Sequence, residues 1–347
     1  MKRHLPFLLV LGLLGALLAS CGQPAPGQHS SVTTATARPT QPAPGPKGRI
    51  AWQGFLDPNQ ITAAIFSANA DGSNVRQLTQ PSRGEQDSFP EWSPDGSKIL
   101  FAGVVANGPS EVWVMNADGS GLKQLTHCTG VCAGAQWGRW SPDGSQILYS
   151  VVENPIRPDG LATREGLWTM QADGSHARRF TYHPPPTGIG DNSPAWSPDG
   201  KHILCVRNRL ANGSYDQQAL FLINRDGSGR KQLTSWELEA GNEHWSPDGK
   251  RILFQSFGSF PDGSTPQLYT MWPDGTHLLQ LTTNERNSWP AWSPDGTQII
   301  FVHRSTTGAT EADLNAHLYV MNADGSGLLQ ITHNPFWQLQ PAWSSAP

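Results

Sequence analysis

The sequence is poor in cysteine and in charge, and it lacks several motifs on which catalysis commonly depends. Only four of the 347 residues are Cys, 15% are charged, and the formal net charge is -4. Such a mild negative charge gives no surface suited to a polyanion, so nucleic acid is not expected as a partner. There is also no phosphate-binding glycine loop, no Cys-x-x-Cys pair and no nucleophile elbow.

Glycine, proline and tryptophan are abundant instead. The chain holds 36 Gly, 29 Pro and 14 Trp. Frequent Gly and Pro are typical of many tight turns between short strands. The length allows two ordinary domains or one large all-β domain.

The N-terminus has the pattern of an export signal. Lys2 and Arg3 precede an apolar run from Leu5 to Leu18, which is too short to be a good membrane-spanning helix. We therefore predict that residues 1–20 are a signal peptide. Leu18-Ala19-Ser20-Cys21 resembles the lipobox of bacterial lipoproteins, which implies that Cys21 accepts a diacylglyceryl group and becomes the new N-terminus. The alternative is an ordinary secretory signal in which Cys21 is incidental.

Residues 21–47 are rich in Pro, Gly, Ser and Thr and have almost no large apolar side chain. Such a stretch cannot bury enough surface to fold, so we predict a flexible tether that spans roughly 30 Å. A lipid at its start and a globular body at its end would give an extracytoplasmic protein that contacts the membrane through a lipid anchor only.

From residue 48 onward the sequence repeats about every 50 residues. Each copy combines three elements: WSPDG, a DG pair after a short apolar run, and a motif close to QLT. WSPDG begins at Trp92, Trp140, Trp196, Trp245 and Trp292, and a broken copy begins at Trp343. QLT-like motifs end at Thr79, Thr126, Thr181, Thr234, Thr282 and Thr332.

Each copy predicts four strands, which we name A to D. Strand A ends in Trp-Ser, strand B follows the PDG turn, strand C precedes the second DG, and strand D ends at QLT. Ser-Pro-Asp-Gly and Asn-Ala-Asp-Gly suit type I turns that end in a left-handed Gly, so A–B and C–D are predicted to be tight hairpins. The repeated Asp residues are therefore interpreted as turn formers rather than catalytic groups.

Both tight turns must lie at the same end of every blade, because the strands alternate in direction. We call this end the turn face. The B–C loops and the D–A links between blades share the opposite end, the loop face, where length and composition vary. Binding residues are usually carried by variable loops on a rigid scaffold, so a ligand is expected at the loop face.

The two ends of the repeat region complement each other. The first copy begins with strand B at residues 49–52, and the last segment, residues 341–344, is a strand A without B, C or D. We predict an all-β, six-bladed propeller of four-stranded antiparallel blades over residues 48–347. The C-terminal strand would complete the first blade and close the ring.

The repeats PxWSPDG, NADGS and QLT resemble the TolB-type propeller repeat from Gly48 to Ser344. The resemblance implies a binding protein of the bacterial cell envelope. TolB proteins carry an N-terminal α/β domain and are soluble in the periplasm, whereas this sequence shows a tether and a lipobox. A role in the Tol–Pal system therefore does not follow from the resemblance.

Four histidines lie in or beside the D–A links, namely His127, His183, His244 and His333. Oligogalacturonate lyases resemble TolB-type propellers and bind a catalytic metal through His residues near the channel. With a carboxylate such as Asp87, Asp191 or Glu243, these histidines are candidate ligands of a divalent metal. The alternative is that they are unrelated loop residues.

Further polar and aromatic residues of the links are candidates for a binding face. They are Asp87, Asp191, Asn192, Asn242 and Asn287, together with Trp137, Trp236, Trp289 and Trp337. The polar side chains either line a binding funnel or cap the links. The aromatic side chains either contact a protein or carbohydrate ligand or fill gaps between blades.

Cys128 and Cys132 are close enough in an exported chain to form a disulfide, although two free thiols are the alternative. Cys205 lies in a strand B and is expected to be buried.

Together these features favour a monomeric, non-catalytic binding module, without a cofactor, that presents one face to an envelope protein or glycan. The alternative is a metal-dependent polysaccharide lyase or hydrolase that works in the channel mouth.

Overall fold

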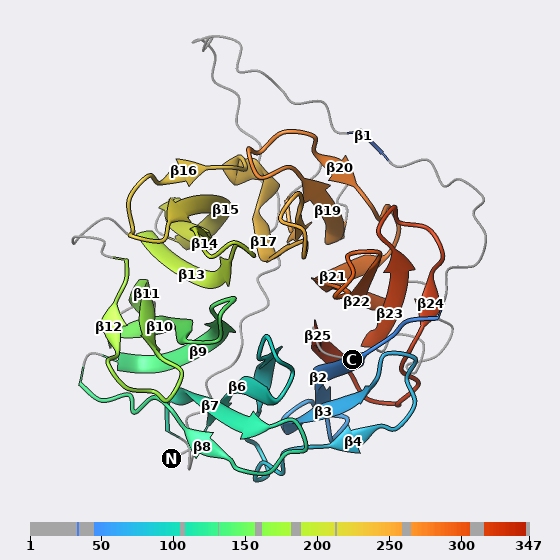
Figure 1. The fold of residues 1–347 in the computed structure, drawn as a ribbon, viewed down its shortest axis with the longest axis horizontal. Helices are drawn as coiled ribbons and strands as arrows, with labels where there is room; N and C mark the ends of the chain where they lie inside the picture. The colour runs from blue at the N-terminus through green and yellow to red at the C-terminus, as the bar shows by residue number, and fades with distance from the viewer. Residues whose placement is uncertain are drawn as a thin grey trace, which may run out of the picture. The chain divides into compact units, whose positions relative to one another are not determined.

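The computed structural model describes residues 33–34, 45–104, 108–130, 132–156, 162–181, 189–211, 214–258, 265–305 and 316–344. Within these ranges the chain forms six antiparallel sheets of four strands, arranged in a ring with one edge of each sheet at the centre (Figure 1). The predicted all-β six-bladed propeller is confirmed. The predicted signal peptide, residues 1–20, and the predicted lipidation site Cys21 lie outside the described residues.

Blade 1 is made of the last strand of the chain and the first three strands of the repeat region. Its strands, from the centre outward, are β25 (Gln338–Trp343), β2 (Arg49–Phe55), β3 (Ala63–Asn69) and β4 (Arg76–Gln77).

Blades 2 and 3 follow in chain order. Blade 2 contains β5 (Ser88–Trp92), β6 (Lys98–Val104), β7 (Ser110–Asn116) and β8 (Lys123–Gln124). Blade 3 contains β9 (Cys132–Trp140), β10 (Gln146–Ile156), β11 (Ala162–Gln171) and β12 (Arg178–Arg179).

Blades 4 to 6 complete the ring. Blade 4 contains β13 (Ile189–Trp196), β14 (His202–Ala211), β15 (Ser214–Asn224) and β16 (Lys231–Gln232). Blade 5 contains β17 (Ala240–Trp245), β18 (Ile252–Ser256), β19 (Gln267–Met271) and β20 (Leu279–Gln280). Blade 6 contains β21 (Arg286–Trp292), β22 (Gln298–Arg304), β23 (Ala316–Asn322) and β24 (Leu329–Gln330).

Two short elements lie outside this pattern. The link between blades 4 and 5 contains one turn of 3-10 helix, η1 (Trp236–Leu238). Strand β1 (Thr33–Thr34) comes from the segment predicted to be a flexible tether, and it pairs in parallel with β20 at the outer edge of blade 5. This pairing was not anticipated from the sequence.

The A–B turns have the predicted chemistry. In the first one the Gly96 N–H donates to the Ser93 carbonyl at 2.8 Å, and Gly96 has a φ of 65°. The Ser93 hydroxyl donates to Asp95 Oδ1 at 2.6 Å, and this bond is the main cause of a lowered Asp95 pKa of about 2. Asp95 is thus an ionised turn residue, as the sequence predicted.

In five of the six blades the glycine of the C–D turn serves both its turn and a close contact between blades, whereas a Cβ on Gly227 in blade 4 would be 3.9 Å from the Phe180 carbonyl oxygen. Gly119 has a φ of 89°, which favours Gly over any other residue. A Cβ atom on Gly119 would also lie 2.9 Å from the Leu78 carbonyl oxygen of the preceding blade. Gly72, Gly275 and Gly325 make the same approach to the carbonyl oxygens of Ile331, Leu233 and Leu281. Tight hairpins and blade packing therefore depend on the same residue.

The threonine of each QLT motif joins strand D to strand C. Its hydroxyl accepts the backbone N–H of the residue fourteen positions earlier, as between Thr126 and Val112 at 2.9 Å and between Thr332 and Leu318 at 2.9 Å. The same bond occurs in the other four blades. A buried N–H that the two-residue D strand cannot reach is thus satisfied by a side chain.

The hydrophobic core consists of six separate clusters, one for each pair of neighbouring blades. Ile50 and Trp52 of blade 1 pack with Ile300 and Leu318 of blade 6, for example. The other five clusters join blades 1 and 2, 2 and 3, 3 and 4, 4 and 5, and 5 and 6. No blade therefore buries its apolar faces without its neighbours.

The C-terminal strand closes the ring as predicted. In the register of β25 with β2, Trp343 lies opposite Ile50 and Ala342 opposite Ala51. The Trp343 indole N–H donates to the Lys47 carbonyl at 2.8 Å, and the Ser344 N–H donates to the Arg49 carbonyl at 2.8 Å. Both ends of the repeat region therefore meet at the turn face of blade 1.

Candidate functional site

All six innermost strands contain a β-bulge at the same position, three residues before the Trp of the Trp-Ser pair. One residue of each bulge has a left-handed φ between 45° and 54°, although none of the six is Gly. These bulge residues are Phe89, Trp137, Ser193, Asn242, Trp289 and Gln340. A non-glycine residue held in this region costs about 1–3 kcal/mol and persists only where the surrounding structure enforces it. Such positions occur preferentially at functional sites.

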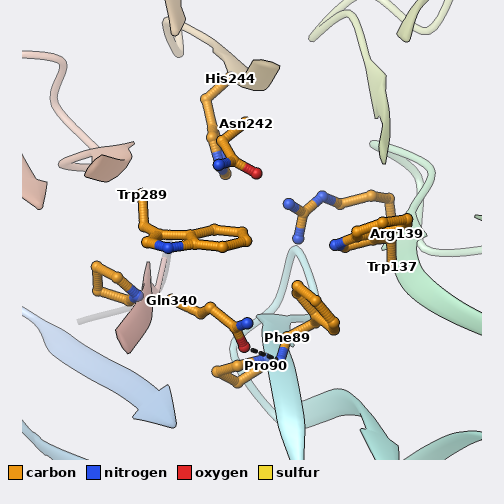
Figure 2. Close-up of a pocket in the computed structure, with 9 residues that line it drawn as sticks. Phe89, Pro90, Trp137, Arg139, Asn242, His244, Trp289 and Gln340 are labelled. Atoms are coloured by element: carbon orange, nitrogen blue, oxygen red, sulfur yellow. Dashed lines mark hydrogen bonds between the residues drawn. The ribbon is translucent and has the colours of Figure 1, made fainter. Parts of the chain in front are cut away.

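Five of the six bulge residues meet around the axis of the ring and narrow it to a waist. Figure 2 shows Phe89, Trp137, Trp289, Asn242 and Gln340 pointing toward one another. The waist encloses about 20 Å³, which is room for about one water molecule. Toward the turn face the channel widens into a space of about 290 Å³. A ligand at the waist must therefore meet aromatic rings and side-chain amides.

The aromatic rings of the waist contact one another. The Phe89 ring centroid lies 5.0 Å from that of Trp137, edge to face, and 5.8 Å from that of Trp289. Two glutamine side chains fix the backbone beneath these rings. The Phe89 N–H donates to Gln340 Oε1 at 2.7 Å, and the Trp289 N–H donates to Gln255 Oε1 at 2.7 Å. The waist is therefore held in place by polar contacts behind its aromatic surface.

Charged groups lie next to the waist on its turn-face side. Arg139 pairs with Glu91 at 2.9 Å, and burial outweighs this pairing, so the pKa of Glu91 is raised. Burial, and secondarily Arg139, lowers the pKa of His244 to about 3, so its imidazole is neutral at physiological pH. His244 lines both the waist and the wider space. The channel thus offers hydrogen-bonding groups with little net charge.

Glu243 differs in residue type from the residues that follow the bulge in the other five blades. Four blades have Pro at this position and one has Gly, whereas blade 5 has a glutamate that is 1% exposed. Neither carboxylate oxygen of Glu243 has a hydrogen-bond partner. Burial raises its pKa well above 4.5, so the neutral form is favoured in the folded protein.

The predicted binding-face residues fall into two groups. Trp137, Asn242 and Trp289 line the waist. Trp236 and Trp337 lie elsewhere in the links, where Arg209 and Arg304 stack over their rings at 4.4 and 4.5 Å. Trp236 and Trp337 also pack against the clusters between blades, as the gap-filling alternative expects, and Trp289 packs against the cluster between blades 6 and 1 in addition to lining the waist.

Four predicted polar residues are enclosed within or between blades rather than exposed on the loop face. Asp191 is fully buried and accepts two bonds from Arg207, at 2.8 and 3.1 Å. Asn287 is 2% exposed and bonds to Gln267 and His303. Asn192 donates to Glu165. Burial raises the pKa of Asp87 to about 6. In the structure these four side chains are buried, and three of them bond to neighbouring side chains, which agrees with the link-capping alternative.

The described members of the predicted histidine cluster, His127, His244 and His333, do not form a metal-binding group with one another. His127 and His333 are exposed after strands β8 and β24, in blades 2 and 6, whereas His244 lines the channel in blade 5. His183 lies outside the described residues. Among the part of the chain that the structure describes, no group of three His, Cys, Asp or Glu side chains is placed to hold a metal ion.

His333 instead lies near His317 and His303, which the sequence did not single out. Burial, followed by His333 and His303, lowers the pKa of His317. His303 bonds to Glu285 at 2.7 Å and to Asn287 at 2.8 Å. Because His303 and His317 lie opposite each other only in the register of β22 with β23, no linear motif indicates this grouping.

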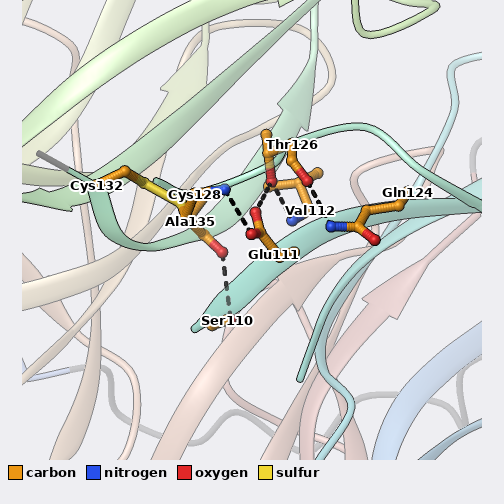
Figure 3. The surroundings of a disulfide bond; sticks show 8 residues. All are labelled: Ser110, Glu111, Val112, Gln124, Thr126, Cys128, Cys132 and Ala135. Atoms are coloured by element: carbon orange, nitrogen blue, oxygen red, sulfur yellow. Dashed lines mark hydrogen bonds between the residues drawn. A yellow bond between two sulfur atoms is a disulfide. The ribbon is translucent and has the colours of Figure 1, made fainter. Parts of the chain in front are cut away.

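Cys128 and Cys132 form a disulfide at the start of β9 (Figure 3). The buried Glu111 carboxylate accepts the Cys128 N–H at 2.6 Å and the Thr126 hydroxyl at 2.5 Å, which fixes the link before the disulfide. Cys205 is a buried free thiol, and burial raises its pKa.

Comparisons with known proteins agree with this architecture. A model of the TolB beta propeller domain matches residues 49–214 and 188–316. The chain belongs to the TolB β-propeller family. Among solved structures, TolB from Acinetobacter baumannii has 20% identity and a TM-score of 0.66, covering 86% of this chain and 66% of that one. This likeness shows the fold alone.

Curated relatives of this TolB-family chain include proteins of different kinds. The Tol-Pal system protein TolB of Anaeromyxobacter dehalogenans is 29% identical over 133 residues, covering 34% of this chain. The uncharacterized peptidase YuxL of Bacillus subtilis is 27% identical over 212 residues, covering 48% of this chain. The alignments span only 28% and 29% of the lengths of these two relatives.

No helix among the described residues is both long and apolar enough to cross a membrane.

Proposed function

We propose that this protein is a non-catalytic binding module of the cell envelope, whose channel waist receives a segment of an envelope protein or glycan from the loop face. The observation that carries the proposal is the gathering of Phe89, Trp137 and Trp289 at strained bulge positions around one axis. The three rings are partly exposed, although holding these non-glycine residues at a left-handed φ costs conformational free energy.

The chemistry of the waist supports a ligand of mixed character. Aromatic faces contact apolar side chains or sugar rings, whereas Asn242 and Gln340 offer amide groups for hydrogen bonds. Only about one water molecule fits at the waist. A ligand is therefore expected to dock at a mouth and reach the waist with one side chain or sugar ring.

The cellular location is part of the same proposal. The export signal and lipobox support an extracytoplasmic protein held to a membrane by a lipid on Cys21. Membership of the TolB propeller family supports a binding role in the envelope. The lyase or hydrolase alternative has no support among the described residues, because no three His, Cys, Asp or Glu side chains there are placed to hold a metal ion.

Photo-crosslinking in intact cells tests the proposal. A photoreactive phenylalanine analogue is placed at Gln340 in the waist, and in a control at Lys201, an exposed turn residue. We expect a discrete adduct with an envelope protein or glycan from position 340 that is absent from position 201. Trp289→Ala should abolish this adduct, whereas Trp236→Ala should leave it. Identical adducts from both positions, or an adduct insensitive to Trp289→Ala, would refute the proposal.

A further inference from the structure

The outer rim of the turn face is apolar on one side of the ring and polar on the other. Among the described residues, the large apolar side chains exposed on the C–D hairpins and D strands are Val75, Leu122, Trp272, Leu328 and Leu329. We call these five residues the apolar arc. They belong to blades 5, 6, 1 and 2, which are consecutive in the closed ring. Leu122 and Leu328 are 56% and 57% exposed.

Comparison of equivalent hairpin positions shows that this asymmetry is local. The residue immediately before the short D strand occupies an equivalent position in these blades, because each hairpin turns at an equivalent Asp-Gly. Blades 1, 2 and 6 place Val75, Leu122 and Leu328 just before the D-strand pairing. Blades 3 and 4 place Ala177 and Arg230 there instead. The hairpin itself therefore does not require an exposed apolar side chain.

The N-terminal segment joins the propeller within this arc. The Gly48 carbonyl accepts the Ala70 N–H at 2.8 Å, so the chain enters blade 1 beside the hairpin that carries Val75. Thr33 and Thr34 pair with β20 at the outer edge of blade 5, the blade that carries Trp272. The described bonds of this segment, from Thr33–Thr34 to β20 and from the Lys47 and Gly48 carbonyls to Trp343 and Ala70, are therefore made with blades 5 and 1, which belong to the arc.

We infer that the apolar arc is a membrane-contact surface, which rests the rim of blades 5, 6, 1 and 2 on the lipid surface that holds the Cys21 anchor. The inference rests on the lipid anchor of the proposed function. Only 11 residues separate Cys21 from Thr33, which pairs with β20 of blade 5. A flexible coil of that length would span roughly 18 Å, so the rim stays within reach of the bilayer.

Charged residues beside the apolar arc determine how deeply its hairpins enter the lipid bilayer. Exposed Arg76 and Lys123 follow Val75 and Leu122, where they can meet lipid phosphates. Asp71 and Asp118 stand at the tips of the same hairpins, and bonds from Ser73 and Ser120 lower the pKa of each carboxyl. These carboxylates remain ionised, so the hairpins lie among the headgroups and only the apolar side chains reach the acyl chains.

This orientation leaves the proposed binding site accessible. Because the arc lies on the turn face, the loop face points away from the lipid and toward the envelope space. A lipid contact on one face and a ligand on the other then do not compete.

Lipid photo-labelling of the full-length lipidated protein tests the inference. The protein is reconstituted in vesicles of phosphatidylethanolamine and phosphatidylglycerol that contain a photoactivatable phospholipid, and adducts are mapped by peptide mass spectrometry. We expect adducts on the hairpins that carry Val75, Leu122, Trp272 and Leu328, and none on the equivalent hairpins at Ala177 and Arg230. Equal labelling of all six hairpins, no labelling of the propeller, or failure of the protein to bind the vesicles would overturn the inference.

A matched pair of variants sharpens the test. Leu122→Ser combined with Leu328→Ser removes the two most exposed leucines of blades 2 and 6 and should reduce labelling at Trp272 about tenfold, since burial of each apolar side chain favours the contact. Ala177→Ser at the equivalent position of blade 3 should leave labelling unchanged. Unchanged labelling in the double variant would contradict a contact made by the arc. The adduct from position 340 reports on the channel independently, so failure of either claim is recognised separately.

Discussion

Individual residues of the repeat are required for different physical reasons. The SPDG aspartates hold turns, and in five of the six blades the glycine of the C–D turn combines a left-handed φ with a close approach to the preceding blade. Glu243, in contrast, departs from the repeat, because it places an unpartnered carboxyl where other blades have Pro or Gly. Two predictions separate these effects.

Gly119→Ala should destabilise the protein by about 2–4 kcal/mol, because the new methyl group adds a clash with the Leu78 carbonyl to the strain of a positive φ. Gly84→Ala is the matched control. Gly84 also has a positive φ, of 90°, but a Cβ there meets nothing within 4 Å, so only about 1 kcal/mol of strain is expected. Chemical denaturation of both variants measures the difference. Equal losses would show that the blade contact contributes nothing.

Glu243→Gln should change how stability depends on pH. The folded-state pKa of Glu243 is raised above its ordinary value of 4.5, so its contribution to stability is full below that pH and is lost as the pH rises toward the folded-state pKa. The variant should therefore lose less stability than the wild type between about pH 5 and about pH 8. Glu237→Gln is the control, because Glu237 is exposed and its pKa is lowered. Parallel pH profiles for wild type and Glu243→Gln would contradict a buried neutral carboxyl.

At the scale of elements, the regular strands were predictable and their irregularities were not. WSPDG and QLT predict hairpins directly, because Pro, Asp and Gly favour the turn conformation and the Thr hydroxyl bonds to the neighbouring strand. The bulges were missed because Phe89, Ser193 and Gln340 share no side-chain chemistry, and only their spacing to the following Trp is constant. Whether Asp191 faces a ligand or Arg207 depends on the pairing of β13 with β14, which the linear sequence does not show.

The hydroxyl of the QLT threonine should be indispensable to the pairing of strands C and D. Thr332→Val keeps the shape but leaves the Leu318 N–H without an acceptor, so a loss of about 1–3 kcal/mol is expected. Thr332→Ser retains the hydroxyl and should lose clearly less. Thermal or chemical unfolding of the pair gives the comparison. A Ser variant as unstable as the Val variant would assign the loss to packing instead.

At the scale of the whole molecule, the fold is a ring whose stability depends on its closure. Six core clusters each need two blades, and the cluster between blades 6 and 1 needs β25. The repeat predicted this closure from sequence alone, since the first copy lacks a strand A and the last segment supplies one. The positions of the waist residues, in contrast, result from all six blades together.

Deletion of residues 341–347 should strongly destabilise the propeller. It removes Trp343, its bond to the Lys47 carbonyl and the pairing of Ala342 and Trp343 with β2, which exposes an open sheet edge. We expect a large decrease in melting temperature and a loss of cooperative unfolding, measured by calorimetry. A truncated chain that melts like the intact one would show that the ring does not close through β25.

Ligand binding at the waist is the central functional property proposed for this protein. The decisive measurement is the affinity of the partner captured from position 340 for the wild type, Trp289→Ala and Trp236→Ala. A ring at the centre of an interface contributes about 2 kcal/mol or more, so Trp289→Ala should weaken binding about thirtyfold, and Trp236→Ala should leave it unchanged. Equal affinities for the wild type and Trp289→Ala would contradict the account.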